Sequence, residues 1–399
     1  MKVLLNDGMD KEGIALFEDV GLRTDTRKKD LGTLVRDIGE FHGLIVRSAT
    51  QVTREVIEAG AAGALQIVGR AGVGIDNINT EAASEYGIVV KYAPTGSTSS
   101  AAELALALMF SVARKIPQAH ASMQSGIWDK KSYGGMEISN KVLGVVGCGN
   151  IGQRLSQLVI GLNMDVLGYD SDTDQVKEKF PDSRIKYVSL DFLLRSSDFV
   201  SIHTGGDILV IGKKELALMK PEAYLINASR PQNIDYLALY EALKSKRIAG
   251  AGIDVHPDEP KLDGSTYKSI FGEFPNVVLT PHFGAQTKEG QRSTSLEISH
   301  AVADYLTKGD FAHSVNVRET VEAERRPVYR LFIHHADVVG AFASIDGVLA
   351  SNGINIRENN SRQLGEDGYV KTVYLVHQTV SPAILRQIEA LPFVKSARM

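Results

Sequence analysis

Arg230, Glu259 and His282 are three residues whose side chains could do chemistry together. Each lies within a few residues of the end of an apolar run that predicts a buried β-strand. The carboxyl ends of parallel strands meet at one edge of a sheet, and ligands of such sheets bind at that edge. We therefore expect the three side chains to converge on one ligand, although they are far apart in the chain.

A guanidinium, a carboxylate and an imidazole in one site suit hydride transfer on a 2-hydroxy acid. Arg230 could bind the acid's carboxylate and polarise the oxygen on C2 with its planar set of donors. His282 could take the hydroxyl proton as hydride leaves C2, and return a proton in the reverse reaction. Glu259 could hold the other ring nitrogen, which would fix the tautomer of His282 and stabilise the imidazolium.

A glycine-rich segment, GCGNIG at residues 147–152, connects an apolar run to a helix-like stretch. Gly147 permits a tight turn, Gly149 lets backbone N–H groups approach a pyrophosphate, and Gly152 allows close helix–strand contact. Asn150 and Ile151, between the last two glycines, are further cofactor-binding candidates, and the N-terminus of the helix predicted at residues 153–161 would stabilise phosphate groups. The pattern predicts a dinucleotide-binding site, and an ordinary turn is the alternative.

An acidic residue, Asp170, completes this pattern. It follows Gly152 by 18 positions and ends the next apolar run. A carboxylate at that place can accept hydrogen bonds from a ribose diol, and it repels the 2′-phosphate of NADP. We therefore predict NAD as the cofactor.

Length and composition predict a globular protein of two to three domains. The 399 residues are 43% hydrophobic, and the net charge of −4 with scattered basic pairs argues against a nucleic-acid partner. The one cysteine, Cys148, cannot form an intrachain disulfide, and His334 and His335 lack companions at zinc-like spacing. No apolar run approaches a membrane span, and the first residues turn polar too soon for a signal peptide. We expect a cytoplasmic protein without a membrane partner or a metal site.

Alternating strand and helix patterns before and after the glycine-rich segment predict an α/β fold with parallel sheets. Long helical patterns at residues 99–119 and 293–306 would lead out of the first block and back to it. We expect a discontinuous, flavodoxin-like substrate-binding domain at residues 1–98 and 291–319, with a Rossmann-type NAD-binding domain inserted at residues 99–290.

The last part of the chain predicts a separate unit. Residues 320–327 are charged, poor in apolar side chains and closed by Pro327, as is typical of a linker. Residues 328–399 show the order strand, helix, strand, strand, helix, strand. This order predicts a ferredoxin-like βαββαβ unit.

Three further segments resemble motifs of a known family when they are taken with the glycine-rich segment. They are NASRPQNID at residues 227–235, DVHPDEP at 254–260 and TPHFGAQT at 280–287. Over nearly its whole length the chain resembles the D-2-hydroxyacid dehydrogenases, and its last unit is similar to an ACT domain. The resemblance implies an NAD-dependent enzyme in which Arg230, Glu259 and His282 are catalytic.

The resemblance also implies binding residues outside the catalytic three. RAGVGIDN at residues 70–77 is similar to the family's substrate loop. The implied substrate contacts are the backbone of Val73 and Gly74, the side chains of Arg47, Ser48 and Ser97, and Lys130, which would reach a neighbouring subunit's site. The implied cofactor contacts are His203, Ala228 and Asp254. The chain departs from the family in having Pro231 after the arginine and a shorter loop after His203.

The resemblance implies oxidation of 3-phospho-D-glycerate to 3-phosphohydroxypyruvate, the first step of L-serine biosynthesis, and a cluster of Arg and Lys suits the phosphate of this substrate. One alternative is the same machinery acting on another 2-hydroxy acid, such as glycerate or lactate. A second is a non-catalytic NAD(H)-sensing protein similar to transcriptional corepressors.

The ACT-like unit implies a small effector, which in this family would be L-serine. The candidate effector contacts are Asp337, Gly340 and Asn355. Asp337 begins the turn that in the family starts with asparagine, whereas Asn355 matches a ligand-contacting asparagine. The resemblance further implies a homodimer or homotetramer.

Overall fold

The structure, a computed structural model, describes residues 1–399 except 207, 261–263, 318–328 and 365–368. Contacts divide the chain into two units, Met1–Val317 and Arg318–Met399. The linker predicted at residues 320–327 and the first residue of the predicted last domain lie outside the described residues. No helix in the described part of the chain is long and apolar enough to cross a membrane.

The first sheet of unit 1 has five parallel strands in the order β2-β1-β3-β4-β5. All four residues of β3 are buried, as expected for a strand covered on both faces. The strands are β1 (Lys2–Leu5), β2 (Arg23–Asp25), β3 (Gly43–Val46), β4 (Ile67–Arg70) and β5 (Val89–Tyr92). This is the flavodoxin-like strand order, so the predicted fold of this part is confirmed.

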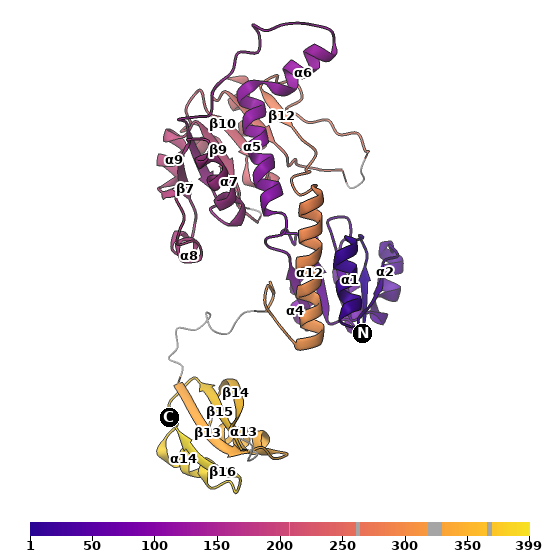
Figure 1. Cartoon of the computed structure of the whole chain (residues 1–399), viewed down its shortest axis with the longest axis vertical. Helices are drawn as coiled ribbons and strands as arrows, with labels where there is room; N and C mark the ends of the chain where they lie inside the picture. Colours follow the sequence, from indigo (N-terminus) through magenta and orange to yellow (C-terminus); the bar gives the residue numbers. More distant parts are fainter. Residues whose placement is uncertain (207, 261–263, 318–328, 365–368) are drawn as a thin grey trace. The chain divides into compact units, whose positions relative to one another are not determined.

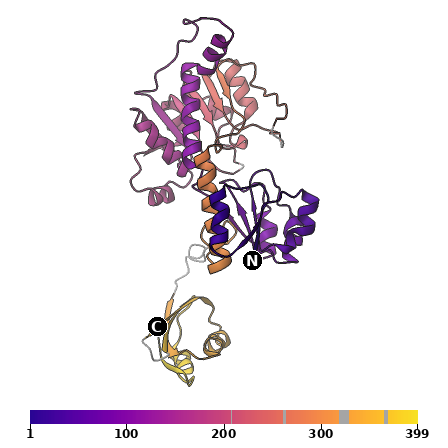
Figure 2. The same cartoon turned by 45° about the vertical axis from the view of Figure 1, so that its right-hand side comes forward.

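Two helices of the first sheet follow aspartates whose side chains cap them. The side chain of Asp10 accepts a hydrogen bond from the backbone N–H of Glu12, and that of Asp30 from Thr33, which satisfies free donors of the first turn. The helices are α1 (Lys11–Asp19), α2 (Leu31–Asp37), η1 (Ile38–Glu40), α3 (Arg54–Ala61), α4 (Thr80–Glu85) and α12 (Lys288–Lys308). The long α12 packs against α1, β4 and β5, so a late segment of the unit covers the first sheet (Figures 1 and 2).

The second sheet has seven parallel strands in the order β12-β11-β10-β9-β6-β7-β8. They are β6 (Val142–Val146), β7 (Asp165–Tyr169), β8 (Lys186–Tyr187), β9 (Phe199–Ile202), β10 (Tyr224–Asn227), β11 (Gly250–Ile253) and β12 (Val277–Leu279). The helices of this part are α5 (Thr98–Arg114), α6 (Ile116–Gln124), α7 (Asn150–Ile160), α8 (Thr173–Lys179), α9 (Leu190–Ser196), α10 (Lys213–Leu216), η2 (Pro231–Asn233) and α11 (Tyr236–Lys244). The strand order reverses direction between β6 and β9, which is the Rossmann arrangement and places a ligand-binding crevice there.

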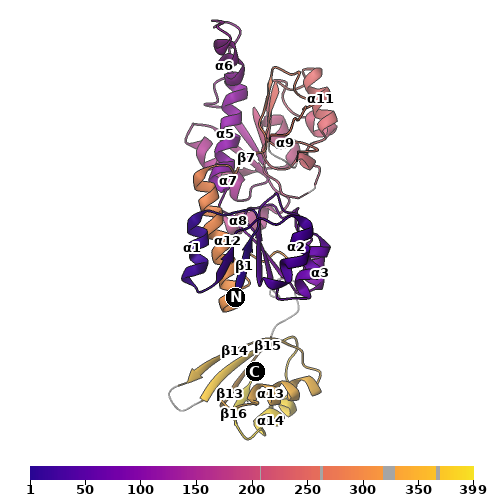
Figure 3. The same cartoon turned by 90° about the vertical axis from the view of Figure 1, so that its right-hand side faces the viewer.

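The single helix predicted at residues 99–119 is wrong, because the structure has two helices there. Helix α5 ends at Arg114, and Lys115 has a left-handed backbone with φ of 50° and ψ of 40°. Pro117 has no N–H and its ring would clash with the carbonyl of Ala113 in a continuous helix. That carbonyl instead accepts the N–H of Met136 at 2.9 Å. Helix α6 continues beyond α5 and buries none of its residues (Figure 3).

Unit 2 is the predicted βαββαβ unit. Its elements are β13 (Tyr329–Ala336), α13 (Ala341–Ser351), β14 (Ile356–Leu364), β15 (Tyr369–Val376), α14 (Pro382–Glu389) and β16 (Val394–Arg398). The antiparallel sheet has the order β14-β15-β13-β16, and its core includes Leu331, Ile345 and Tyr374. The predicted ferredoxin-like fold of the last unit is therefore confirmed.

Candidate active site

The structure places Arg230, Glu259 and His282 after three neighbouring strands of the second sheet. Arg230 follows β10, Glu259 follows β11 and His282 follows β12, and these strands are adjacent and parallel. The three side chains therefore leave the same carboxyl edge. Asn227, the last residue of β10, donates from its amide Nδ2 to the carbonyl of Arg230 at 3.0 Å, which holds the first of the three loops.

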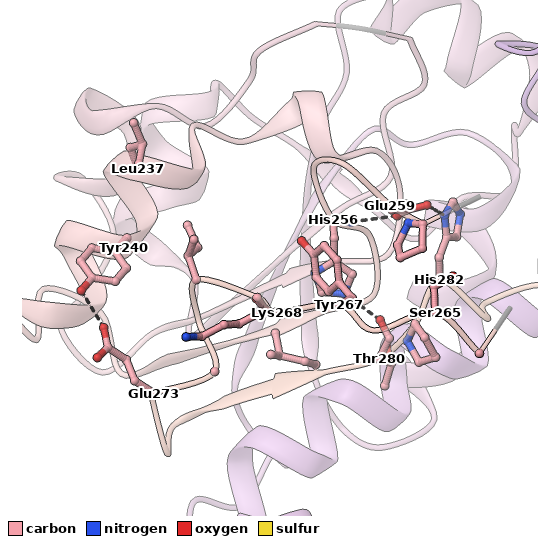
Figure 4. A pocket seen from close by; sticks show the side chains of 17 residues that line it. Leu237, Tyr240, His256, Glu259, Ser265, Tyr267, Lys268, Glu273, Thr280 and His282 are labelled. Atoms are coloured by element: carbon pink, nitrogen blue, oxygen red, sulfur yellow. Dashed lines mark hydrogen bonds and ion pairs between the residues drawn. The ribbon is translucent and has the colours of Figure 1, made fainter. Parts of the chain in front are cut away.

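Glu259 and His282 form a hydrogen-bonded pair (Figure 4). Oε2 of Glu259 lies 2.7 Å from Nδ1 of His282, and Oε1 of Glu259 accepts the backbone N–H of His256 at 2.8 Å. The His282 side chain is 47% exposed, so a ligand can reach it. Because Nδ1 faces the carboxylate, the other nitrogen, Nε2, is left to exchange a proton with a ligand.

The pair shifts both pKa values. The hydrogen bond that His282 donates to Glu259 raises the pKa of His282 above its ordinary value, and this outweighs burial and the nearby charge of Arg230, which lower it. For Glu259, burial raises the pKa, but hydrogen bonds from His282 and from the N–H of His256 together bring it below its ordinary value. Glu259 therefore stays ionised beside an imidazole that protonates readily.

Asp254 holds the loop that carries His282. This carboxylate is almost fully buried and accepts the hydroxyl of Thr280 at 2.7 Å and the backbone N–H groups of Phe283 and Gly284 at 3.1 Å each. The backbone N–H of His282 donates to the Asp254 carbonyl at 2.8 Å. The φ of His282 is 51°, a conformation that a side-chain-bearing residue keeps only when its surroundings hold it. Asp254, predicted as a cofactor contact, thus also fixes the histidine.

The guanidinium of Arg230 lies against the predicted substrate loop. Its backbone is extended, with φ of −136° and ψ of 142°, as expected for a residue before proline. Nη1 donates to the carbonyl of Ser229 at 2.9 Å, and Nη2 lies 3.2 Å from a carboxylate oxygen of Asp76. A Cβ added to Gly74 would lie 2.0 Å from Nη2 of Arg230. The first part of the chain thus meets the second at this arginine.

Two more arginines lie near Arg230, and sequence reasoning missed one of them. Burial is the main cause that lowers the pKa of Arg70 to about 10, and the charges of Arg230 and Arg47 lower it further. A Cβ on Gly72 would lie 1.7 Å from Nη1 of Arg70. The signal was present in the sequence, because Arg70 ends β4 directly before the glycine-containing loop. Three partly buried guanidinium groups, with Asp76 and Asp7 as the acidic residues whose charges act on Arg70, form a site for an anion.

The other predicted substrate residues lie in different surroundings. The backbone N–H of Arg47 donates to the carboxylate of Asp7 at 2.7 Å, and Ser48 and Val73 are exposed. Ser97 is buried and precedes the first turn of α5. Lys130 is exposed in the segment after α6 and forms no ion pair with any residue that the structure describes. A role for Lys130 within its own chain therefore has no support from a contact.

The glycine-rich turn has the shape that a dinucleotide needs. Gly147 has φ of +91°, and a Cβ there would lie 2.6 Å from the backbone of His203. A Cβ on Gly152 would lie 2.3 Å from the carbonyl oxygen of Gly147, whereas the space around Gly149 is open. An open cradle at the N-terminus of α7, which begins at Asn150, fits a pyrophosphate.

The remaining predicted cofactor residues surround this turn. Asp170 accepts the backbone N–H of Cys148 at 2.8 Å, so its carboxylate is fixed at the end of β7. Nδ2 of Asn150 donates to the carbonyl of Pro94 at 3.0 Å. Burial lowers the pKa of His203 to about 4, and its Nε2 lies 2.8 Å from Oγ of Ser201. His203 is therefore neutral at physiological pH. Ile151 lies in the first turn of α7, and Ala228 is half-buried after β10.

The contact between Gly74 and Arg230 gives a direct test of the site. We expect Gly74→Ala to lower kcat/KM by about 10-fold to 10²-fold, because the methyl group would displace the guanidinium from the ligand. Thermal stability should change little, since the displaced atom ends a flexible side chain. Gly347→Ala is the matched control, because a Cβ at Gly347 meets no atom within 4 Å. Equal kinetics in the two variants would contradict the placement of Arg230.

Comparisons with known proteins identify the family. Residues 106–284 match the model of the D-isomer specific 2-hydroxyacid dehydrogenase NAD binding domain, and residues 329–393 match the ACT domain. The D-3-phosphoglycerate dehydrogenase of Escherichia coli strain K12 is 33% identical to the chain, over all of the chain and 97% of the relative. The chain therefore belongs to the D-isomer-specific 2-hydroxyacid dehydrogenases. The predicted family and the predicted NAD cofactor are confirmed.

Other relatives carry different names or lengths. A D-3-phosphoglycerate dehydrogenase of Methanocaldococcus jannaschii is 36% identical over 85% of the chain, which spans only 64% of that relative. A hydroxypyruvate reductase of Thermotoga maritima is 39% identical over 74% of the chain and 95% of the relative. The solved structure of a D-2-hydroxyisocaproate dehydrogenase is 30% identical to the chain and superposes with a TM-score of 0.68. The superposition covers 79% of the chain and 100% of the dehydrogenase chain.

Proposed function

We propose that the protein is an NAD-dependent dehydrogenase that interconverts 3-phospho-D-glycerate and 3-phosphohydroxypyruvate. The observation that carries the proposal is the hydrogen bond between Nδ1 of His282 and Oε2 of Glu259, 2.7 Å long, beside Arg230. Arg230 lies close enough that its charge lowers the pKa of His282. An acid–base group and a carboxylate-binding group thus share one edge of a sheet with the dinucleotide cradle. This combination supports redox chemistry on a 2-hydroxy acid.

The phosphate is proposed from the arginine cluster. Arg70 and Arg47 flank Arg230 closely enough that the charges of Arg230 and Arg47 lower the pKa of Arg70. A substrate with one carboxylate at Arg230 leaves Arg47 and Arg70 with only the more distant charges of Asp7 and Asp76 as negative partners. A phosphate at the far end of the substrate would neutralise them, and guanidinium groups suit its geometry.

In the proposed mechanism, the chain binds, orients and exchanges a proton with the substrate. Arg230 holds the carboxylate and the oxygen on C2, where negative charge gathers. Nε2 of His282 takes the hydroxyl proton during oxidation and returns it during reduction, while Glu259 stabilises the imidazolium. The residues at 147–152 and Asp170 would hold NAD, which supplies hydride chemistry when it is bound.

The assay that tests the proposal compares two substrates with the same purified protein. NADH oxidation should have a kcat/KM at least about 10²-fold higher with phosphohydroxypyruvate than with hydroxypyruvate, since the phosphate adds charge-assisted hydrogen bonds. The second candidate, a hydroxypyruvate reductase, is favoured by the 39% identical relative and predicts the opposite preference. NADH binding without turnover of either substrate would instead favour a sensing protein.

The Glu259–His282 pair predicts a pH dependence with a definite sign. Reduction needs protonated His282, so its kcat/KM should be highest below the raised pKa of His282 and fall as pH rises through it. Glu259→Gln removes the charge that raises this pKa. We expect kcat to fall about 10²-fold and the falling limb to move to lower pH. A falling limb at the same pH in Glu259→Gln and in the unaltered protein would contradict the role of Glu259.

We also propose that unit 2 binds an amino-acid effector and that the protein assembles from identical subunits. Gly340, with φ of +85°, is the N-cap residue of α13, and it is exposed together with Asp337 and Asn355. Helix α6 and the segment after it expose Met123, Ile127 and Trp128, the last to 82%. An apolar arm of this kind is typical of a surface that a second subunit covers. Inhibition of NADH oxidation by L-serine would test the proposed effector site. The mass measured by light scattering would test the proposed assembly.

A further inference from the structure

His256 connects the two loops that carry Glu259 and His282 (Figure 4). It lies three residues after the end of β11 and is 7% exposed. Nε2 of its ring lies 2.8 Å from the carbonyl oxygen of Thr280, which precedes His282 by two residues. Its backbone N–H donates to Oε1 of Glu259 at 2.8 Å. One residue therefore contacts the catalytic carboxylate directly and the histidine loop through its side chain.

The hydrogen bond to Thr280 defines the tautomer of His256. A carbonyl oxygen only accepts hydrogen bonds, so Nε2 of His256 must carry the proton. Nδ1 of the same ring is buried and has no hydrogen-bond partner among the residues that the structure describes. The ring thus acts as a donor toward one loop only.

The segment around His256 is fixed from two further sides. The hydroxyl of Tyr236 donates to the carbonyl of Val255 at 2.5 Å, and the hydroxyl of Tyr267 donates to that of Pro257 at 3.0 Å. The ring of Tyr267 packs against that of His256 with centroids 5.4 Å apart. His256 is therefore a rigid anchor from which the bond to Thr280 extends.

Packing alone does not hold the catalytic pair. Glu259 and His282 line one wall of an open cavity of about 1200 Å³, together with His256, Tyr267 and Thr280 (Figure 4). Asp258 and His282 also have left-handed backbones, with φ of 58° and 51°. Such conformations persist where surrounding contacts enforce them. Beside an open cavity, those contacts have to come from hydrogen bonds.

We propose that His256 is a positioning residue for the reaction, whose Nε2–H bond to Thr280 fixes the distance between Glu259 and His282. It touches neither the substrate nor NAD in this account. Its effect reaches the chemistry through the pair, so the inference rests on the proposed acid–base function. Loss of the bond should loosen the 2.7 Å contact without changing the dinucleotide cradle.

Two variants of equal length separate the hydrogen bond from packing. His256→Gln keeps a side-chain N–H donor, whereas His256→Met has no donor at all. Both keep the backbone N–H that Glu259 accepts. We expect Met to lower kcat about 10-fold and Gln to stay within about 3-fold of the unaltered protein, with the NADH Kd unchanged in both. Should Met fail to fold, His256→Phe removes the same donor and keeps an aromatic ring beside Tyr267.

The titration of His282 separates a positioning role from a merely structural one, because a merely structural role would leave this titration unchanged. The charged groups around it are Glu259, Asp254 and Arg230, and none of them is altered in these variants. In His256→Met, the bond between His282 and Glu259 should weaken, so the falling limb of the pH profile for reduction should move to lower pH. In His256→Gln, the falling limb should lie where it does in the unaltered protein. Equal profiles for Gln and Met would overturn the inference, whatever their melting temperatures.

The same titration distinguishes this inference from the proposed function. Ring-proton NMR of His282 follows its protonation without any turnover. If the unaltered protein reduces neither keto acid, the proposed function fails, and a difference in the His282 titration between Gln and Met would still support the positioning role. Identical titrations would overturn it.

Discussion

Replacing His282 with alanine is expected to lower kcat by about 10³-fold while the NADH Kd changes by less than about 2-fold. The variant removes the group that exchanges the proton with the C2 oxygen, and general acid–base catalysis contributes about 10²–10⁴-fold. NADH binding should survive because the dinucleotide cradle at residues 147–152 belongs to a different loop. Steady-state kinetics with phosphohydroxypyruvate and a fluorescence titration with NADH measure the two quantities separately.

A matched control for this variant is His300→Ala. His300 is an exposed histidine on α12, and no hydrogen bond joins it to Glu259 or Arg230 among the described residues. Its kinetics should equal those of the unaltered protein. Retention of more than about a tenth of the activity in His282→Ala would show that another group exchanges the proton.

Changing Arg230 to lysine should lower kcat/KM by about 10²–10³-fold, although the positive charge remains. Lysine cannot reproduce the planar set of donors that binds a carboxylate at two points, and each lost charge-assisted bond weakens binding of the transition state. The ion pair with Asp76 at 3.2 Å should also be lost, because it depends on Nη2. The loss should appear in both KM and kcat, since Arg230 contacts the carboxylate and the reacting oxygen.

Arg195→Lys tests whether any arginine exchange has this effect. Arg195 is exposed in the last turn of α9, at a distance in sequence from the site loops. It should leave kcat/KM within about 2-fold of the unaltered protein. A comparable loss in both variants would point to a general effect of lysine on folding, which a melting curve would detect.

The convergence of the three proposed catalytic residues could be predicted because one rule of sheet topology brings them together. Arg230, Glu259 and His282 each follow an apolar strand, and parallel strands place their carboxyl ends at one edge. The glycine-rich turn was predictable for a similar reason, since Gly147 and Gly152 lie where an added Cβ would clash with backbone atoms, and the open space at Gly149 leaves room for a ligand. Both predictions depended on local patterns joined by a known sheet geometry.

Other features depended on contacts that no local pattern contains. Arg70 was missed because its role comes from the proximity of Arg47 and Arg230, two residues from other parts of the chain. The prediction of one helix at residues 99–119 followed its apolar pattern and gave too little weight to Pro117. Strand β2 and helix α2 were not predicted, because they are short and their burial depends on neighbouring strands.

The hydrogen bonds of His256 and Asp254 also could not be predicted from the sequence. Both residues lie in DVHPDEP, yet their partners at Thr280 and Gly284 belong to the next loop. A motif states which residues are present, whereas the register of two loops at a sheet edge decides which of them touch. Such positioning contacts therefore required the structure.

The most direct test of the account is a crystal structure of the protein with NADH and a non-reacting 2-hydroxy acid analogue that carries a phosphate. We expect Nε2 of His282 and the guanidinium of Arg230 within hydrogen-bond distance of the oxygen on C2, and C2 about 3–3.5 Å from C4 of the nicotinamide. The phosphate should contact Arg70 or Arg47. An analogue bound elsewhere, with His282 and Arg230 facing separate cavities, would contradict the central claim.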